Sequence, residues 1–149
     1  MKFKENTTFL MLKINTPPGI DFLSEHKSIL DQTGEVWFCR FGKTNAIKSK
    51  ITADGNYIFF KDSARNNNRI YVATISNISE TPLSKNYPSY YDIIDLGRPL
   101  WFCLSDIKEI NPELVNQNFR TKASNSPLSN VYRSMCQSFY IQCISDTEL

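Results

Sequence analysis

The sequence predicts an α+β fold, a small and mostly antiparallel β-barrel with two or three short helices packed at its ends. The chain has 149 residues, of which 41% are hydrophobic and 21% charged, as expected of a single globular domain. About six or seven short β-rich stretches are separated by turn residues. Those in the middle follow one another without a long helix between them, which favours antiparallel pairing. We therefore expect one domain over residues 1–149.

The first elements have clear local signals. Residues 9–14 predict a strand, which Pro17-Pro18-Gly19 ends because neither a strand nor a helix continues through this turn. Residues 20–32 predict a short helix with Asp21 near its start and Gly34 just beyond its end. His26 falls on the apolar face of this helix, which indicates a packed, hydrogen-bonded histidine rather than a catalytic one.

Strands dominate the middle of the chain. Residues 35–41 alternate strongly and predict a strand. A weak strand near residues 50–52 leads to a hairpin signal at Asp54-Gly55, and residues 57–61 and 69–78 predict two further strands. The connection over residues 80–96 contains two prolines and three tyrosines.

The last third mixes both kinds of element. Residues 100–110 predict a strand that becomes irregular after Ser105, and Asn111-Pro112-Glu113 predicts the start of a short helix. We expect a loop over residues 119–130. Residues 131–136 are expected to be helical, and residues 139–144 to form the closing strand.

Little in the sequence suggests an enzyme. The chain has only 5 glycines, no glycine-rich phosphate loop and no nucleophile elbow. A single histidine excludes a multi-histidine metal site, so we expect no metal and no cofactor. The 4 cysteines form no C-x-x-C pair and are expected to be reduced and mostly buried. No stretch reads as a signal peptide or a transmembrane helix, so we expect a cytoplasmic protein with no membrane partner.

The charge and aromatic patterns together raise the hypothesis of a polyanion partner, whereas the charge alone favours a solvated basic face. Residues 40–69 hold seven Lys or Arg against two Asp, a local net charge of +5. Trp37-Phe38 and Trp101-Phe102 each begin a W-F-C triplet in a predicted strand. In each pair one ring enters the core, and the other needs a covering helix or a ligand. Plain core packing of both tryptophans remains the alternative.

The faces of the aromatic strand suggest which ring is free. Val36 and Phe38 suit the interior of a small barrel, whereas Trp37 and Phe41 share a face with Glu35, a carboxylate that would not enter the core unpaired. We therefore expect a half-exposed Trp37 on the helix-covered side, at the mouth of a slot for a flat ring. A nucleobase stacked there contributes about 1–3 kcal/mol.

The order of elements resembles the PUA-like superfamily, most of all its EVE, YTH and ASCH branches. The matching stretches are FLMLKINTPPGIDFLSEHK, GEVWFCRFGK, GNYIFFK, RIYVATISNI and SPLSNVYRSMCQSFYI, which together span almost the whole chain. This resemblance implies a module that takes a modified base of DNA or RNA into an aromatic cage. Some such modules are fused to nucleases of modification-dependent restriction systems.

The resemblance frames a pocket between the loop after the first strand, the aromatic strand and the segment before the last strand. The residues expected to contact the base are Asn15, Thr16, Trp37, Phe38, Phe41, Trp101 and Ser134. The residues expected to contact phosphate are Arg40, Lys43 and Arg133.

Three functions follow as hypotheses. The first is a non-enzymatic reader of a flipped or single-stranded modified base in DNA or RNA, a candidate specificity domain of a restriction or defence system with a nuclease or ATPase as partner or fused domain. The second is a small ASCH-like hydrolase of acylated nucleosides, which requires a Lys and Glu pair in the cleft. The third is a protein-interaction module.

Overall fold

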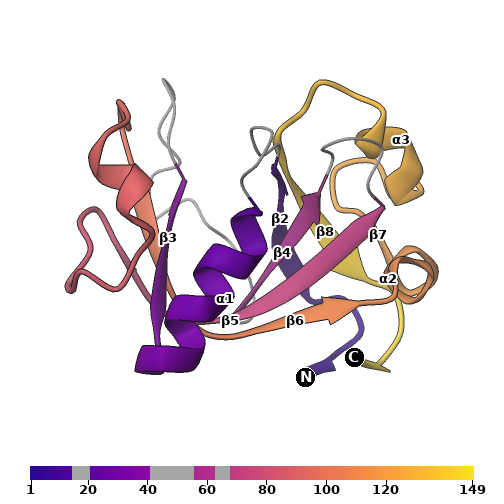
Figure 1. The fold of residues 1–149 in the computed structure, drawn as a ribbon. Helices are drawn as coiled ribbons and strands as arrows, with labels where there is room; N and C mark the ends of the chain where they lie inside the picture. Colours follow the sequence, from indigo (N-terminus) through magenta and orange to yellow (C-terminus); the bar gives the residue numbers. More distant parts are fainter. Residues whose placement is uncertain (15–20, 41–55, 63–67) are drawn as a thin grey trace. The chain divides into compact units, whose positions relative to one another are not determined.

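The computed structural model describes residues 1–14, 21–40, 56–62 and 68–149. The elements in this part of the chain are β1 (Lys2–Phe3), β2 (Thr8–Ile14), α1 (Phe22–Thr33), β3 (Val36–Arg40), β4 (Tyr57–Asp62), β5 (Arg69–Ser79), η3 (Ser89–Asp92), β6 (Leu100–Ile110), α2 (Pro112–Asn118), β7 (Phe119–Thr121), α3 (Leu128–Tyr132), β8 (Ser138–Cys143) and β9 (Thr147–Glu148). Strands outweigh the few short helices (Figure 1), which confirms the α+β prediction.

The predicted barrel is wrong for the part of the chain that the structure describes. The seven-stranded sheet has the order β3-β6-β5-β4-β2-β8-β7 and is not closed. β2 pairs with β4 in parallel, with Leu10 opposite Ile58. A parallel pair cannot be joined by a hairpin and needs a crossover connection. The strands therefore do not follow one another around a simple antiparallel meander.

The residues group into two compact units. The first comprises Met1–Asn15, Thr52–Val72 and Lys108–Leu149, and the second comprises Thr16–Ile51 and Ala73–Ile107. Each unit has its own cluster of buried side chains.

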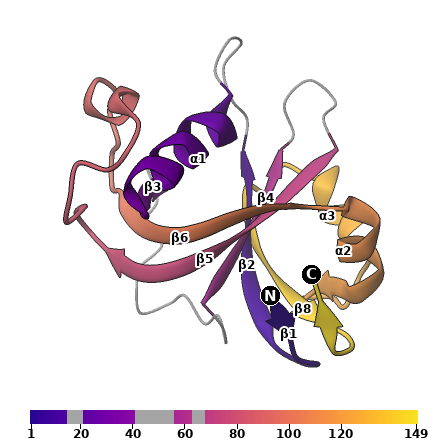
Figure 2. The same ribbon diagram turned by 60° about the horizontal axis from the view of Figure 1, so that its bottom comes forward.

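In the first unit, β2 lies between β4 and β8 (Figure 1). Its core is rich in aromatic rings, and the centroids of Phe59 and Phe119 lie 5.2 Å apart. The two ends of the chain meet in this unit (Figure 2), where β1 pairs with β9 and the Met1 amino group donates to the Leu149 carbonyl oxygen at 3.1 Å.

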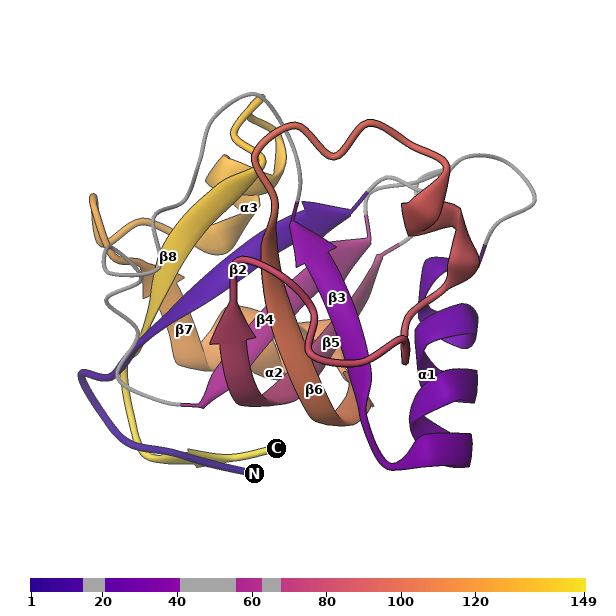
Figure 3. The same ribbon diagram turned by 90° about the vertical axis from the view of Figure 1, so that its left-hand side faces the viewer.

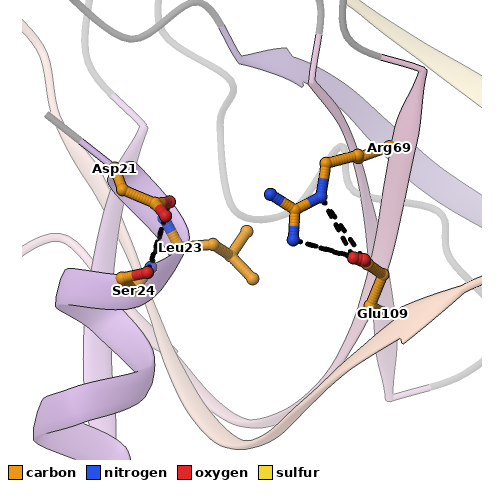
Figure 4. Close-up of polar contacts among 5 residues, drawn as sticks. All are labelled: Asp21, Leu23, Ser24, Arg69 and Glu109. Atoms are coloured by element: carbon orange, nitrogen blue, oxygen red, sulfur yellow. Dashed lines mark hydrogen bonds and ion pairs between the residues drawn. The ribbon is translucent and has the colours of Figure 1, made fainter. Parts of the chain in front are cut away.

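In the second unit, α1 lies alongside β3 (Figure 3). The Asp21 carboxylate accepts hydrogen bonds from the backbone N–H groups of Leu23 and Ser24, both at 3.2 Å (Figure 4), and so caps the helix. Gly34 ends the helix at φ 83°, a left-handed conformation that favours glycine. Both residues lie at the helix ends as predicted.

Other predicted boundaries need correction. Residues 119–121, expected in a loop, form β7, because pairing with β8 and burial of Phe119 stabilise a strand too short to show a pattern of its own. β6 remains a strand to Ile110 instead of becoming irregular after Ser105. The helix expected over 131–136 is α3 and begins earlier, at Leu128. The weak strand near 50–52 and the Asp54-Gly55 turn lie outside the described residues.

Candidate functional site

Two lysines lie side by side in the first unit. Lys13 on β2 and Lys61 on β4 are register partners in the parallel pair, one residue before the end of each strand. Register partners on neighbouring strands project from the same face of a sheet. The side chains are nonetheless buried, since Lys13 is 9% and Lys61 7% exposed. Lysine is rarely buried to this extent without a partner.

α3 (Leu128–Tyr132) contacts Lys61, and the segment that follows this helix contacts Lys13. The Lys13 ammonium donates a hydrogen bond to the Ser134 carbonyl oxygen at 2.7 Å. The Lys61 ammonium donates to the Asp62 carbonyl oxygen at 2.9 Å and lies 5.3 Å from the centroid of the Tyr132 ring. A backbone carbonyl and an aromatic face stabilise an ammonium group without removing its positive charge.

Burial weakens the charged form of both lysines. It lowers the pKa of Lys13, and negative charge at Cys136 acts in the opposite direction. It also lowers the pKa of Lys61, where the Asp62 carboxylate raises the value and the neighbouring Lys13 lowers it further. Burial therefore acts against the charged form of both lysines, and repulsion by Lys13 adds to this effect at Lys61.

The sequence alone does not single out Lys13 and Lys61, whereas it does point to the nearby residues Arg133 and Ser134. Ser134 does lie beside Lys13, but its hydroxyl donates to the Val131 carbonyl oxygen at 2.7 Å and its carbonyl oxygen faces the lysine. Arg133 follows the last turn of α3. The roles expected of Ser134 and Arg133, base and phosphate contacts respectively, remain predictions. The available signal was a lysine near the end of each of two strongly apolar strands, TFLMLKI and YIFFKD.

The expected free face of Trp37 does not exist in the structure. Trp37 is 1% exposed and belongs to a cluster with Trp101 and the tyrosine-rich connection. Tyr87 and Tyr91 lie 5.1 and 5.3 Å from Trp101, measured between ring centroids. The prediction of a half-exposed Trp37 is therefore wrong, because residues 80–96 supply rings that cover this side of the strand. Trp101, also expected to contact the base, is buried in the same cluster.

The assignment of strand faces also needs correction. Phe38, expected to fill a barrel, has its ring 6.0 Å from the imidazole of His26 on α1. Phe38 thus lies beside the helix, in the place expected of Trp37. His26 itself is buried and its Nε2 lies 2.9 Å from the Tyr91 hydroxyl, which confirms the packed, hydrogen-bonded histidine.

The remaining residues expected at the site are Arg40 and four residues that the structure does not describe. Arg40 is half-buried at the end of β3, opposite Leu100, and its contact with phosphate remains a prediction. Four of the expected residues lie outside the described part of the chain: Asn15, Thr16, Phe41 and Lys43.

The cysteines of the second unit are poor nucleophiles. All four cysteines of the chain are free and three are buried, as expected of mostly buried thiols. Burial raises the pKa of Cys39 to about 12. Burial also raises that of Cys103 to about 11, helped by its hydrogen bond to the Glu35 carboxylate at 3.0 Å. Both thiols therefore remain protonated at neutral pH.

Among the described residues of the second unit, two buried polar side-chain atoms have no hydrogen-bond partner. They are the indole nitrogen of Trp37 and one carboxylate oxygen, Oε2, of Glu25. A buried polar atom without a partner costs folding free energy.

Within the described ranges, no group of three or more His, Cys, Asp or Glu is placed to hold a metal ion. No helix in these ranges is long and apolar enough to cross a membrane. The chain matches no family model, no curated protein and no solved structure.

Proposed function

We propose that this chain is a nucleic-acid-binding module in which Lys13 and Lys61 hold a phosphate group. The observation that carries the proposal is the placement of two largely buried lysine residues as register partners on neighbouring strands. Phosphate contacts supply much of the affinity of proteins for nucleic acids, and lysine is a common donor to them.

A purely structural role explains this pair less well. Burying a charged lysine costs free energy, and a second cation beside it adds repulsion. Apolar side chains of similar volume would stabilise the same positions better. An anion that binds near the two amines would offset the cost of burying them and the repulsion between them. We therefore favour ligand binding over packing as the role of the pair.

The resemblance to PUA-like domains extends the proposal to the base. Asn15 and Thr16 follow Lys13 by two and three residues. Both residues lie outside the described part of the chain, and their contact with a base is what the resemblance implies. A modified base in a flipped or single-stranded nucleotide is the ligand that this resemblance favours. The buried Trp37 ring has no part in this version of the site.

Fluorescence anisotropy with a labelled single-stranded oligonucleotide tests the proposal. We expect Lys13→Met to weaken binding about tenfold or more, because a hydrogen bond to a charged group contributes about 1.5–3 kcal/mol. The matched control is Lys122→Met, which removes the same charge from an exposed position of the same unit. Methionine suits a buried site, so a loss of binding by Lys13→Met cannot be attributed to unfolding if its thermal midpoint is unchanged or higher. Equal affinities of the two variants would refute the proposal.

An ASCH-like hydrolase is the second candidate. The observation that favours it is the lowered pKa of Lys13, because a neutral amine can act as a general base. Against it, no carboxylate among the described residues forms an ion pair with Lys13, whereas the hydrolase needs a Lys and Glu pair. Release of acyl groups from free acylated nucleosides, absent in Lys13→Met, would favour the hydrolase over the reader.

A further inference from the structure

We infer that Met135, in the loop between α3 and β8, inserts between neighbouring bases of a bound nucleic acid. The inference rests on the proposed function, since it names the side chain that meets the bases of a strand whose phosphate is held by Lys13.

Met135 stands out from the surface of the first unit. It is 94% exposed, the highest value among the large hydrophobic side chains of the described part of the chain. Single exposed apolar residues are common on protein surfaces, so exposure alone does not indicate a ligand. The hydrogen bonds that hold the loop and the charge around it do indicate one.

Lys13 holds this loop on both sides of Met135. Its ammonium donates a hydrogen bond to the Ser134 carbonyl oxygen at 2.7 Å, and its backbone N–H donates to the Gln137 carbonyl oxygen at 2.8 Å. The Ser134 hydroxyl also accepts from the Cys136 backbone N–H at 3.3 Å. Met135 therefore extends from a backbone that is already ordered, which lowers the entropy cost of placing its side chain in a ligand.

The charge around the loop suits a polyanion. Residues 114–145 contain three basic side chains and no Asp or Glu. One of the three, Arg133, is exposed and precedes Met135 by two residues. Asp62 follows Lys61 on β4, and alternation directs neighbouring residues of a strand to opposite faces of the sheet. Charge complementarity therefore favours a nucleic acid over a partner with a basic surface.

The second most exposed of these apolar side chains has the opposite surroundings. Ile93 is 83% exposed and lies between Asp92 and Asp95 in the sequence, both of which are also exposed. These carboxylates would repel phosphate groups. Exposure of a large apolar residue is thus combined with a basic neighbour at Met135 and with acidic neighbours at Ile93, which makes Ile93 a matched control.

The methionine side chain suits insertion into a base stack. It is unbranched and flexible, and its thioether makes favourable contacts with aromatic rings. Methionine is also among the apolar side chains that proteins insert between base steps. Insertion removes the exposed side chain from water, and this gain offsets the loss of stacking between the two bases.

An oligonucleotide that contains 2-aminopurine tests the insertion, because the emission of this base increases when its stacking is lost. Single strands with 2-aminopurine at successive positions are titrated with the protein, and the anisotropy of an end label gives the affinity. Met135→Gln keeps the length of the side chain and replaces its apolar end by an amide. We expect this variant to bind about tenfold or more weakly and to abolish the increase in emission, because burial of an apolar side chain is lost.

Two further variants serve as controls. Met135→Leu keeps an apolar side chain and should retain both the affinity and the increase in emission. Ile93→Gln makes a comparable change at an exposed position with acidic neighbours and should leave both unchanged. Since Met135 and Ile93 are exposed, the thermal midpoints of all variants should equal that of the unmodified protein, so weaker binding cannot be attributed to unfolding.

The possible failures are distinguishable. If Met135→Gln binds as tightly as the unmodified protein, or more weakly with an unchanged increase in emission, this inference is overturned and the proposed function stands. Vesicles of anionic phospholipid test a membrane as the alternative partner. Vesicle binding that is lost in Met135→Gln, with no change in oligonucleotide binding, would also overturn the inference. If no strand binds at low salt, both the inference and the proposed function are refuted.

Discussion

Replacement of Trp37 by alanine is expected to destabilise the protein strongly. A buried tryptophan removes about 150–250 Å² from water, which corresponds to about 4–6 kcal/mol at about 25 cal/mol per Å². Trp37 is 1% exposed and packs with Trp101 and Tyr91. Its replacement by alanine therefore removes nearly all of this burial free energy. Measured truncations of buried aromatic residues cost about 3–5 kcal/mol, which we take as the expected loss. A domain of ordinary stability has only about 5–15 kcal/mol in total.

Urea denaturation measures this loss. Far-UV circular dichroism and the fluorescence of the remaining Trp101 should both show an earlier transition in Trp37→Ala. The matched control is Trp37→Phe, which keeps an aromatic ring and gives up only an indole N–H that has no partner. We expect the control to lose about 1–2 kcal/mol at most, since no hydrogen bond is broken and only part of the ring volume is lost.

One result would refute this reasoning. The free energy of unfolding of Trp37→Ala could lie within about 1 kcal/mol of that of the unmodified protein, while oligonucleotide binding weakens by about 1–3 kcal/mol. In that case the ring lies at a binding surface. That is the outcome expected from the sequence alone, and it would contradict the buried cluster.

Two further predictions concern titration and reactivity. Burial lowers the folded-state pKa of Lys13, so the unfolded chain binds more protons between that pKa and the ordinary lysine pKa of 10.5. The free energy of unfolding of the unmodified protein, relative to that of Lys13→Met, should therefore rise as the pH increases through this window. Urea titrations from pH 7 to 10.5 measure this difference. A difference that stays constant or falls would contradict the prediction. In the folded protein one thiol, Cys136, should react rapidly with a thiol reagent and the buried Cys39, Cys103 and Cys143 slowly. Mass spectrometry of the modified peptides identifies the order, and rapid modification of Cys39 would show that its cluster is open.

Local signals determined the helix ends. Asp21 and Gly34 bound α1, and Asn111 caps α2 by accepting from the Glu113 N–H at 2.9 Å. Each of these contacts joins residues only two to four positions apart. The residue types needed at such positions are restricted by the backbone geometry, so the sequence shows them directly. The buried face of α1 can also be predicted from the sequence, because helical periodicity places His26 on the apolar side of the helix.

Only the tertiary structure decided which strands pair and which side chains are covered. Alternation places Trp37 and Phe38 on opposite faces, but it does not say what lies over each face, and here residues 80–96 and α1 contribute the covering rings. The parallel pairing of β2 with β4 likewise follows from the path of the chain and not from any local pattern. That pairing brings together Lys13 and Lys61, each of which reads alone as an ordinary lysine near the end of a strand. Their shared burial and mutual repulsion exist only once the two strands are neighbours, because electrostatic coupling depends on distance in space and not on distance along the chain.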